Sequence, residues 1–352
     1  MSDPATSPQP GVPPQPTLRD GDLVLRPWSF DDVEAARLQH DDEIAHWFGF
    51  PEAIPPAEKQ RKAIERWHAD YADGRKVVSF VVEHRRNLAG TVEVKQRPDE
   101  VGELSWAIFP RHRGQGLATR AVRLLIDYSF GELGLSRVQA YAEPQNLASL
   151  RTAGRAGLRR EGIVRGREEA RGERRPYVQL ARLATDPEPT SPLGFRAVLN
   201  AGLPTKRVIA QGLGRNSAGG VLLCELTYKR EWDLPGGVVD PHESPAHAVV
   251  REIREELGVD MTVAGLTAVN WLPAWRGWDD ACLFVFDLGV HDDGLVQTAT
   301  LEPREIRALH WCSLEQVGEH GAAYLTRMLT RLLHPPAARI GTAYLEDGAD
   351  PT

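Results

Sequence analysis

The chain has 352 residues, of which 41% are hydrophobic and 26% are charged, and its formal net charge is −7. This length exceeds that of a typical single domain, so we expect a globular protein with two domains. The negative charge gives no electrostatic support for a nucleic-acid or membrane partner, and neither is expected. No run reaches the roughly 18 apolar residues of a membrane helix, and the N-terminus lacks the basic and apolar regions of a signal peptide. The cysteines Cys224, Cys282 and Cys312 lack metal-ligand spacing and suit a reducing compartment, so we expect a cytoplasmic protein.

Changes in composition divide the chain. Residues 1–16 are rich in Pro, Ser and Gln and are expected to form a disordered tail. A second turn-rich stretch predicts a linker over 185–194. These bounds predict one domain over 17–184 and another over 195–334, followed by a flexible tail over 335–352.

The first block mixes helical and strand periods. In chain order, the patterns predict helices over 29–48 and 63–72, a hairpin over 76–97 that turns at 86–90, a strand over 101–110, a helix over 117–134 and a strand over 137–143. Strands and helices in this order favour an α/β (α+β) domain with a largely antiparallel sheet.

A basic, glycine-bearing turn follows the strand that ends at Pro110. Arg111, Gly114 and Gly116 fit the pattern R/Q-x-x-G-x-G/A immediately before a helix. Successive backbone N–H groups at such a helix N-terminus bind a pyrophosphate. An ordinary connection between a strand and a helix is the alternative for so short a pattern. Downstream, Asn146 and Ser149 introduce another helix.

With the opening "LVLRPWSFDDVEAARL", the block from Leu18 to Ala184 resembles the GNAT acetyltransferases. The resemblance is greatest to the branch that acetylates ribosomal-protein N-termini and small amines. It implies a mixed sheet with flanking helices, acetyl-CoA as cosubstrate, and a small-molecule or protein N-terminal amine as acceptor.

The resemblance also implies roles for individual residues. Backbone groups of Ala107, Ile108 and Phe109 would pair with the pantetheine arm, which Asn146 would also contact. The amides of the loop would hold the pyrophosphate, and these belong to Arg113, Gly114, Gln115, Gly116, Leu117, Ala118 and Thr119.

The acid and base of the transfer are less defined. Many members carry a Tyr acid seven residues after the Asn, where this chain has Ala153. Ser149 is the replacement donor that remains, and Glu103 on the preceding strand is the candidate base, directly or through water.

The second block reads as two strands, a helix, a strand over 281–290 and a final helix over 320–333. Ser244 and Gly258 are suited to the start and the end of the first helix. Its apolar stripe is Val249, Ile253 and Leu257, and another face carries Glu252, Glu255 and Glu256. Like charges at this spacing repel one another unless a divalent cation such as Mg²⁺ lies among them. A solvated acidic face is the alternative for three glutamates taken alone.

The spacing around this helix is more specific than its charge. It matches every fixed position of the Nudix box, G-x5-E-x7-R-E-U-x-E-E-x-G-U, through Gly237, Glu243, Arg251, Glu252, Ile253, Glu255, Glu256, Gly258 and Val259. The block from Gly194 to Leu333 therefore resembles a Nudix hydrolase. The resemblance implies an α/β/α sandwich that hydrolyses a nucleoside diphosphate-linked substrate with Mg²⁺ or Mn²⁺.

Carried over by position, Glu252, Glu255 and Glu256 and the carbonyl of Gly236 would hold the metal. Arg251 would orient the carboxylates, and Glu243 would brace the loop or assist an outer metal. Glu252 is the expected general base, with Glu302 and Glu305 as alternatives that are equally compatible with surface acids.

Trp232, Trp271 and Trp275 are candidates to stack on a substrate base. A partly buried aromatic cluster, with Trp278, is the alternative. The sequence does not choose among nucleoside triphosphates, nucleotide sugars and dinucleotides.

The chain is therefore expected to be a bifunctional enzyme, an N-acetyltransferase joined to a Nudix pyrophosphohydrolase. The alternative is that one domain is active and the other serves as an acetyl-CoA or nucleotide sensing module. The acyl acceptor, the oligomeric state and any coupling of the sites stay open.

Overall fold

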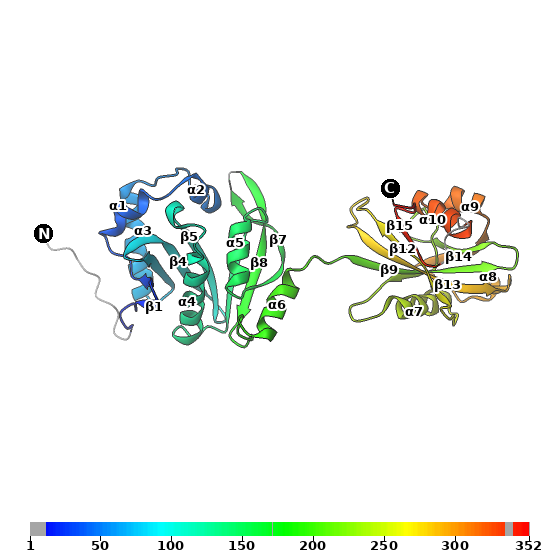
Figure 1. The fold of residues 1–352 in the computed structure, drawn as a ribbon, viewed down its shortest axis with the longest axis horizontal. Coiled ribbons are helices and arrows are strands. Elements are labelled where there is room, and N and C mark those ends of the chain that lie inside the picture. Colours follow the sequence, from blue (N-terminus) through cyan, green and yellow to red (C-terminus); the bar gives the residue numbers. More distant parts are fainter. Residues whose placement is uncertain (1–11, 171, 335–340, 352) are drawn as a thin grey trace. The chain divides into compact units, whose positions relative to one another are not determined.

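The computed structural model describes residues 12–170, 172–334 and 341–351. The chain divides into two compact units, Met1–Leu203 and Pro204–Thr352. Each unit is built on one β-sheet with helices on both faces (Figure 1).

The N-terminal unit contains an eight-stranded sheet in the order β1-β2-β3-β4-β5-β6-β8-β7. Among the strands that the structure describes in this sheet, β5 and β6 are the one parallel pair, so the expected largely antiparallel sheet is confirmed. These two strands pair only from Val101 to Glu103 of β5, so the sheet opens beyond Glu103. The strands are β1 (Leu18–Asp20), β2 (Leu23–Arg26), β3 (Val77–His84), β4 (Asn87–Arg97), β5 (Val101–Ile108), β6 (Arg137–Ala142), β7 (Arg159–Ala170) and β8 (Glu173–Leu183).

Helices cover both faces of this sheet. Phe80 and Val81 are neighbours on β3 and therefore point to opposite faces. Val81 packs in a cluster with residues of α1, α2 and α3, whereas Phe80 packs in a cluster with residues of α4 and α5. The helices are α1 (Asp32–Arg37), α2 (Asp42–Phe48), α3 (Ala57–Ala72), α4 (Leu117–Gly131), α5 (Leu147–Arg155) and α6 (Pro192–Gly202), with a 3-10 turn at Pro110–His112.

Two local expectations in this unit differ from the structure. The helix expected over 29–48 is divided into α1 and α2, because Asp41 adopts an extended conformation and its carboxylate accepts from Ile44 N as the cap of a new helix. The β3–β4 turn lies at Arg85 and Arg86, not at 86–90. Both residues have positive φ, as a two-residue hairpin turn requires.

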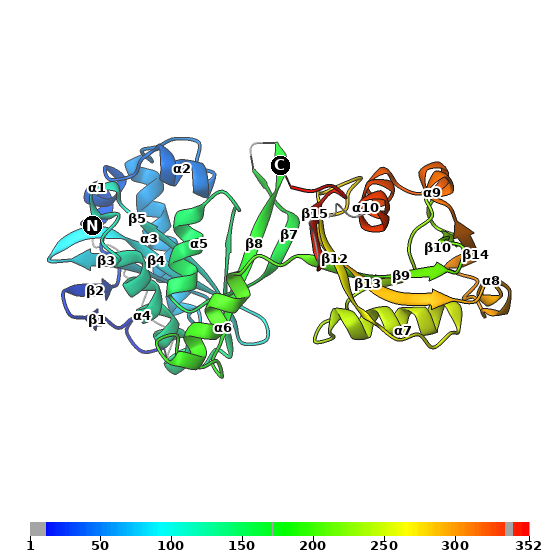
Figure 2. The ribbon, with the colours of Figure 1, turned by 45° about the vertical axis from the view of Figure 1, so that its right-hand side comes forward.

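The C-terminal unit contains a seven-stranded sheet in the order β14-β10-β9-β13-β12-β15, with β11 paired to β9. Helix α7 covers one face of this sheet, and α9 and α10 cover the other (Figure 2). This α/β/α arrangement is the expected one. The strands are β9 (Arg207–Asn216), β10 (Val221–Leu226), β11 (Gly236–Val238), β12 (Gly265–Leu272), β13 (Ala281–His291), β14 (Ile306–Cys312) and β15 (Ala343–Glu346); the helices are α7 (Pro245–Leu257), α8 (Leu295–Thr298), α9 (Leu314–His320) and α10 (Ala323–Leu333).

The expected linker over 185–194 is wrong in position. Ser191 accepts from Gly194 N as the N-cap of α6, and α6 belongs to the N-terminal unit. The division between the units falls after Leu203, and a domain start at 195 is therefore too early.

Both expected tails are also corrected where the structure describes them. Residues 1–11 lie outside the described residues, but the carbonyl of Pro13 accepts from the Tyr71 hydroxyl and Gln15 donates to Ser79 O. Residues 335–340 also lie outside them, but β15 pairs in parallel with β12, and Leu345 is completely buried. Contacts with α3 and β3 hold the first segment, and pairing with β12 holds the second; composition predicts neither.

Candidate active sites

The loop before α7 brings two glycines against the acidic helix. Gly236 and Gly237 pair with Gln211 and Ala210 of β9. A Cβ on Gly237 would lie 2.6 Å from the carboxyl carbon of Glu252. The absence of a side chain at Gly237 therefore leaves the space that the Glu252 carboxylate occupies.

Local signals set the position of α7. Ser244 accepts from His247 N at the first turn, and Gly258 ends the helix with a φ of 64°. The stripe of Val249, Ile253 and Leu257 is completely buried against the sheet. The Nudix-box helix is therefore anchored through one face, which leaves its glutamates on the others.

Arg251 connects the carboxylates of this motif. It makes two hydrogen bonds of 3.0 Å to the two oxygens of Glu243. Its third nitrogen lies 3.0 Å from both Glu252 and Glu255. The orienting role expected for Arg251 and the bracing role expected for Glu243 are compatible with these bonds.

Glu256 occupies a different environment from its neighbours. It is 7% exposed, whereas the side chain of Glu255 is 58% exposed. Burial, and then the charges of Glu252 and Glu305, raise the pKa of Glu256 to about 8, and a hydrogen bond from Gly236 N opposes this shift. Burial also raises the pKa of Glu252, against the lowering effect of Arg251. The helix thus gathers carboxyl groups at a buried position, where they resist ionisation in the absence of a cation.

The loop after α8 supplies another carboxylate. Glu302 N donates to the carbonyl of Glu256, and the carbonyl of Glu305 accepts from Thr227 N, so this loop is fixed between α7 and the end of β10. The Glu305 side chain interacts with Glu256, whereas Glu302 accepts from Arg304 N. Of the two alternatives to Glu252, the structure therefore brings Glu305 to the cluster.

The donor set matches a hard divalent cation in chemistry, because carboxylate oxygens surround a glycine turn. Within the described ranges, no group of three or more His, Cys, Asp and Glu side chains is arranged to hold a metal ion. Glu252 and Glu255 turn toward Arg251 instead.

The expected stacking role of Trp232 is contradicted. His310 and His320 stack on its ring at centroid distances of 4.0 and 3.9 Å, with interplanar angles of 8° and 11°. Because both imidazoles lie nearly parallel to the indole at van der Waals distance, no face of the Trp232 ring is free to stack on a substrate base. Trp271 donates to Asp280 at 3.2 Å, and Trp275 is 52% exposed with the Arg276 guanidinium over its ring. Of the three candidates, Trp275 is the most exposed.

In the N-terminal unit, the glycine loop adopts the conformation that an anion nest requires. Gly114 and Gly116 both have a φ of 75°, and Gly116 is the N-cap of α4. The first helical bond runs from Arg120 N to Gly116 O, so the preceding amides point out of the helix end. The loop lines a cavity of about 350 Å³, here called the donor cavity, together with Asn146 and Ser149 of the α5 start.

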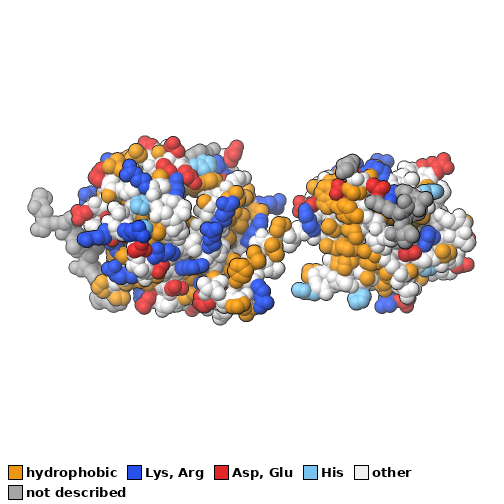
Figure 3. Space-filling model, in the orientation of Figure 1, with side chains coloured by type: hydrophobic (Ala, Val, Ile, Leu, Met, Phe, Trp, Pro, Cys, Tyr) orange, Lys and Arg blue, Asp and Glu red, His pale blue; other side chains and the backbone are white. Residues whose placement is uncertain are grey.

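Cations surround the donor cavity. Arg151 and Arg155 of α5 line it, and Lys and Arg side chains lie over the face that carries α4 and α5 (Figure 3). Arg113 also lines it, but this guanidinium is bound to Asp41, Glu43 and the carbonyl of Ile108. The side chain of Arg113 therefore fixes the loop, and its cationic charge is already paired.

The remaining residues of the loop motif differ in position. Gly114, Gly116, Leu117, Ala118 and Thr119 line the donor cavity. Arg111 and Gln115 do not line it, and the Gln115 amide donates to the carbonyl of Arg111.

The backbone N–H and C=O groups of β5 next to the donor cavity alternate in direction from one residue to the next. Phe109 N donates to Ala89 O, so the backbone groups of Phe109 and Ala107 face β4. Those of Trp106 and Ile108 then face the opening between β5 and β6. Ala107 and Ile108 line the donor cavity, whereas Phe109 does not.

The candidate acid and base separate in the structure. Ser149 lines the donor cavity, and its backbone N–H donates to the Asn146 side chain at 3.0 Å. Glu103 instead forms ion pairs with Arg97 at 3.0 Å and Arg167 at 3.1 Å, and it lines none of the cavities that contain Ser149. The structure therefore gives no support to Glu103 as the base.

A second cavity, of about 410 Å³, lies between the sheet and the α2–α3 layer and is here called the aromatic cavity. Its wall includes Glu93, which sequence analysis did not select. Glu93 lies between Val92 and Val94, whose side chains are completely buried on the other face. A charged residue between two apolar residues of a strand indicates a polar position on the opposite face of the sheet. The local sequence does not predict that α3, which is distant along the chain, covers this face. The aromatic wall is formed by Trp28, Phe48, Phe50, Trp67, Trp106 and Phe109.

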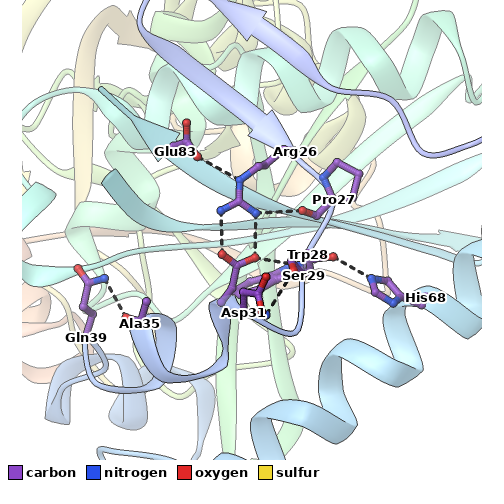
Figure 4. A network of polar contacts seen from close by, with 10 residues as sticks. Arg26, Pro27, Trp28, Ser29, Asp31, Ala35, Gln39, His68 and Glu83 are labelled. Carbon is purple, nitrogen blue, oxygen red and sulfur yellow. Dashed lines mark hydrogen bonds and ion pairs between the residues drawn. The ribbon is translucent and has the colours of Figure 1, made fainter. Parts of the chain in front are cut away.

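Trp28 is held in this wall by polar contacts at the end of β2. Arg26 makes two hydrogen bonds of 2.8 Å to Asp32. It makes another of 3.1 Å to Glu83 (Figure 4). His68 of α3 donates to the carbonyl of Trp28 at 2.9 Å (Figure 4). The indole donates to Ser79 Oγ. This network ties α1 and α3 to the sheet and fixes one side of the aromatic cavity.

Comparisons with known proteins identify both domains. Residues 22–159 match the acetyltransferase (GNAT) domain model, and residues 206–331 match the NUDIX domain model. The chain is 30% identical over 158 residues to the uncharacterized N-acetyltransferase YoaA of Bacillus subtilis (strain 168), which covers 43% of this chain and 86% of that protein. It is 43% identical over 77 residues to the probable N-acetyltransferase YjcK of the same organism, which covers 22% of this chain and 42% of that protein. It is 35% identical over 92 residues to CTP pyrophosphohydrolase of Escherichia coli (strain K12), which covers 26% of this chain and 62% of that protein.

The chain therefore belongs to the GNAT acetyltransferase family through its N-terminal unit and carries a NUDIX domain in its C-terminal unit. It spans about half of the length of the first curated relatives it matches, 42% of one and 54% of the next. In the described part of the chain, no helix is long and apolar enough to cross a membrane.

Proposed function

We propose that the N-terminal unit is an acetyl-CoA-dependent N-acetyltransferase. The observation that carries this is the loop at the α4 N-terminus, where Gly114 and Gly116 turn successive amides toward the donor cavity. These amides and the helix dipole would bind the pyrophosphate of CoA, and Arg151 and Arg155 add positive charge beside it. Asn146, at the other side of the cavity, would contact the pantetheine arm.

The open edge of β5 would receive the rest of the donor. Trp106 and Ile108 present backbone groups to the gap between β5 and β6, so a pantetheine arm can pair there as a short strand would. Ser149 would donate a hydrogen bond to the departing thiolate. The acceptor is a small-molecule or protein N-terminal amine.

We also propose that the C-terminal unit hydrolyses a nucleoside diphosphate-linked substrate with Mg²⁺ or Mn²⁺. The observation that carries this is the buried carboxyl of Glu256 beside the like charges of Glu252 and Glu305, an unfavourable arrangement that a cation would reverse. Glu252, Glu255, Glu256 and the carbonyl of Gly236 would hold the metal, with Glu305 as a further ligand or base. When bound, the metal neutralises the diphosphate and lowers the pKa of a water.

The residues of this unit would have separate tasks. Arg251 would release Glu252 and Glu255 to the cation while keeping Glu243 and the loop in place. Glu252 remains our choice for the group that accepts a proton from the attacking water. Gly237 leaves the Glu252 carboxylate the space that a side chain at this position would fill.

The hydrolase is tested with a panel of nucleoside triphosphates, nucleotide sugars and dinucleotides in Mg²⁺ and in Mn²⁺. We expect phosphate or nucleotide release from at least one class and its loss in Glu256→Gln. No release from any member of the panel with either metal would contradict the proposal.

The acetyltransferase is tested by calorimetric binding of acetyl-CoA to the full chain. We expect one site per chain, abolished by Thr119→Glu. Glutamate at this position is compatible with the first turn of α4 but repels an anion. Failure to bind acetyl-CoA would contradict the proposal. We further propose that the protein acts in the cytoplasm, where its three free cysteines stay reduced.

A further inference from the structure

We propose that the aromatic cavity is the acceptor site, that it takes a primary amine carried on a planar aromatic body, and that Glu93 is the residue that receives the ammonium proton. The inference rests on the acetyltransferase activity proposed above and specifies its acceptor and its base.

The aromatic cavity adjoins the donor cavity. Four residues line both of them, namely Ile44, Phe48, Trp106 and Ala107. Trp106 and Ala107 belong to the open part of β5, where the thioester end of the donor is expected. An amine bound in the aromatic cavity therefore approaches the acetyl group at the boundary between the two.

The walls of the aromatic cavity favour a flat, apolar ligand body. Trp28 and Trp67 stack on each other at 5.1 Å and form one wall, and Phe50 and Phe109 belong to the wall near α2. Aromatic rings bind another ring through its face or edge and gain more than from an aliphatic group of equal area. The volume of about 410 Å³ is within the range of small-molecule sites.

Glu93 is the carboxylate on the floor of this cavity. On the sheet it lies between Ser79 of β3 and Ser105 of β5, which are its direct partners in register. Among the described residues no Lys, Arg or His forms an ion pair with Glu93, in contrast to Glu103, which has two. An unpaired carboxylate in an aromatic cavity is suited to a cationic amine, because the amine supplies the missing charge.

The electrostatic surroundings support a proton acceptor. Burial raises the pKa of Glu93, and a hydrogen bond from Trp67 and the charges of Arg66 and Lys95 oppose part of this effect. A raised pKa brings a carboxylate closer to the range in which a general base works at neutral pH. The other charged or titratable groups around the cavity are Asp70, Glu52, Lys59, Lys62 and His40.

The transfer balances with these groups. The ammonium gives one proton to Glu93, and the neutral nitrogen attacks the acetyl carbonyl carbon. The new N–C bond forms as the C–S bond breaks, and the second amine proton goes to the thiolate to give CoA with a free thiol. Glu93 then returns its proton to solvent.

The acceptor class is tested on the full chain with acetyl-CoA and three amines. The matched pair is 2-phenylethylamine and 2-cyclohexylethylamine, which have the same linker and charge and differ in ring planarity. A short peptide with a free N-terminus is the third. We expect kcat/KM for the aromatic amine to be at least about tenfold higher than for either other amine, since a stacking preference of about 1.4 kcal/mol has this size. Equal rates within the pair, preference for the peptide, or no acetylation of the aromatic amine would overturn the acceptor class.

The base is tested with Glu93→Gln, beside Glu65→Gln of the solvent-exposed side of α3 as the matched control. We expect Glu93→Gln to lower kcat by about 10²-fold or more and to remove the acidic limb of the pH–rate profile, with acetyl-CoA affinity unchanged. The control should retain both. An unchanged acidic limb in Glu93→Gln, or a larger loss from Glu103→Gln, would overturn the assignment. Absence of acetyl-CoA binding by the unaltered chain would instead overturn the activity on which the inference rests.

Discussion

Gly237 approaches Glu252 so closely that a Cβ on the glycine would lie 2.6 Å from the carboxyl carbon and 2.8 Å from Oε1. Gly237 is the first fixed glycine of the Nudix box, and Glu252 is the glutamate that directly follows its fixed arginine. A side chain at this position would therefore displace the Glu252 carboxylate, whereas the φ of Gly237 itself lies in the ordinary range.

Replacement of this glycine should impair hydrolysis without unfolding the unit. Gly237→Ala forces the Glu252 carboxylate to move, and a displacement of about 1 Å at a reacting group lowers kcat on the order of 10²-fold. Steady-state hydrolysis of the substrate found in the panel measures the effect. The matched control is Gly265→Ala, where a Cβ meets nothing within 4 Å. Equal activity in the two variants would show that the close approach has no catalytic importance.

Trp232 should act on stability and not on base selectivity, because His310 and His320 cover both ring faces. Trp232→Ala removes a partly buried indole, and we expect about 2 kcal/mol of destabilisation. This corresponds to a fall of roughly 4–8 °C in the Tm of the C-terminal unit. The order of preference among different nucleotide bases should stay the same. A changed order with an unchanged Tm would restore a stacking role.

The C-terminal strand should contribute to the stability of the NUDIX domain. Leu345 is completely buried, whereas its neighbour Tyr344 is 49% exposed. Leu345→Ala should therefore destabilise the C-terminal unit by about 3 kcal/mol. Tyr344→Ala should cost less than about 1 kcal/mol. Differential scanning calorimetry distinguishes the two, and equal Tm values would indicate that β15 is not packed in solution.

The stability of the metal-free C-terminal unit should decrease with pH. In the unfolded chain the Glu256 carboxyl has the ordinary value of 4.5, whereas its folded pKa is about 8. Between these values the folded state binds the additional proton, so the stabilisation present below 4.5 is lost as the pH rises through 8.

This dependence is measured as the Tm of the unit in EDTA at several pH values. Glu256→Gln, which cannot ionise, should show a flatter profile, and excess Mg²⁺ should reduce the fall in the unaltered chain. A Tm that rises with pH in EDTA, or identical slopes in the two proteins, would contradict the environment described for Glu256.

Helix α7 illustrates what the sequence could specify. Its cap at Ser244, its stop at Gly258 and its buried stripe are all local, and each is found where it was expected. The start of α6 and the division between α1 and α2 were not predicted, because at both places the local sequence is compatible with more than one structure. Ser191 and Pro192 are a good helix start, but the prolines around them favoured a linker. Asp41 was one of several acids that could have capped a helix.

The missed site residues depend on contacts between distant segments. The two imidazoles that stack on Trp232 come from β14 and from the end of α9. No residue pattern near Trp232 in the sequence predicts these contacts. Glu93 becomes a cavity residue only because α3 covers its face of the sheet. Glu103 has the residue type of a base, but Arg167 of β7 reaches it across the sheet. Tertiary pairing of this kind is not contained in a local pattern.

The most direct test of the account is a paired assay on one full-length preparation, in which acetyl-CoA binding and metal-dependent diphosphate hydrolysis are measured for the unaltered chain, Thr119→Glu and Glu256→Gln. We expect both activities in the unaltered chain, loss of acetyl-CoA binding alone in Thr119→Glu, and loss of hydrolysis alone in Glu256→Gln. If either activity is absent from the unaltered chain, or if one variant abolishes both, the account of two independently organised catalytic units is wrong.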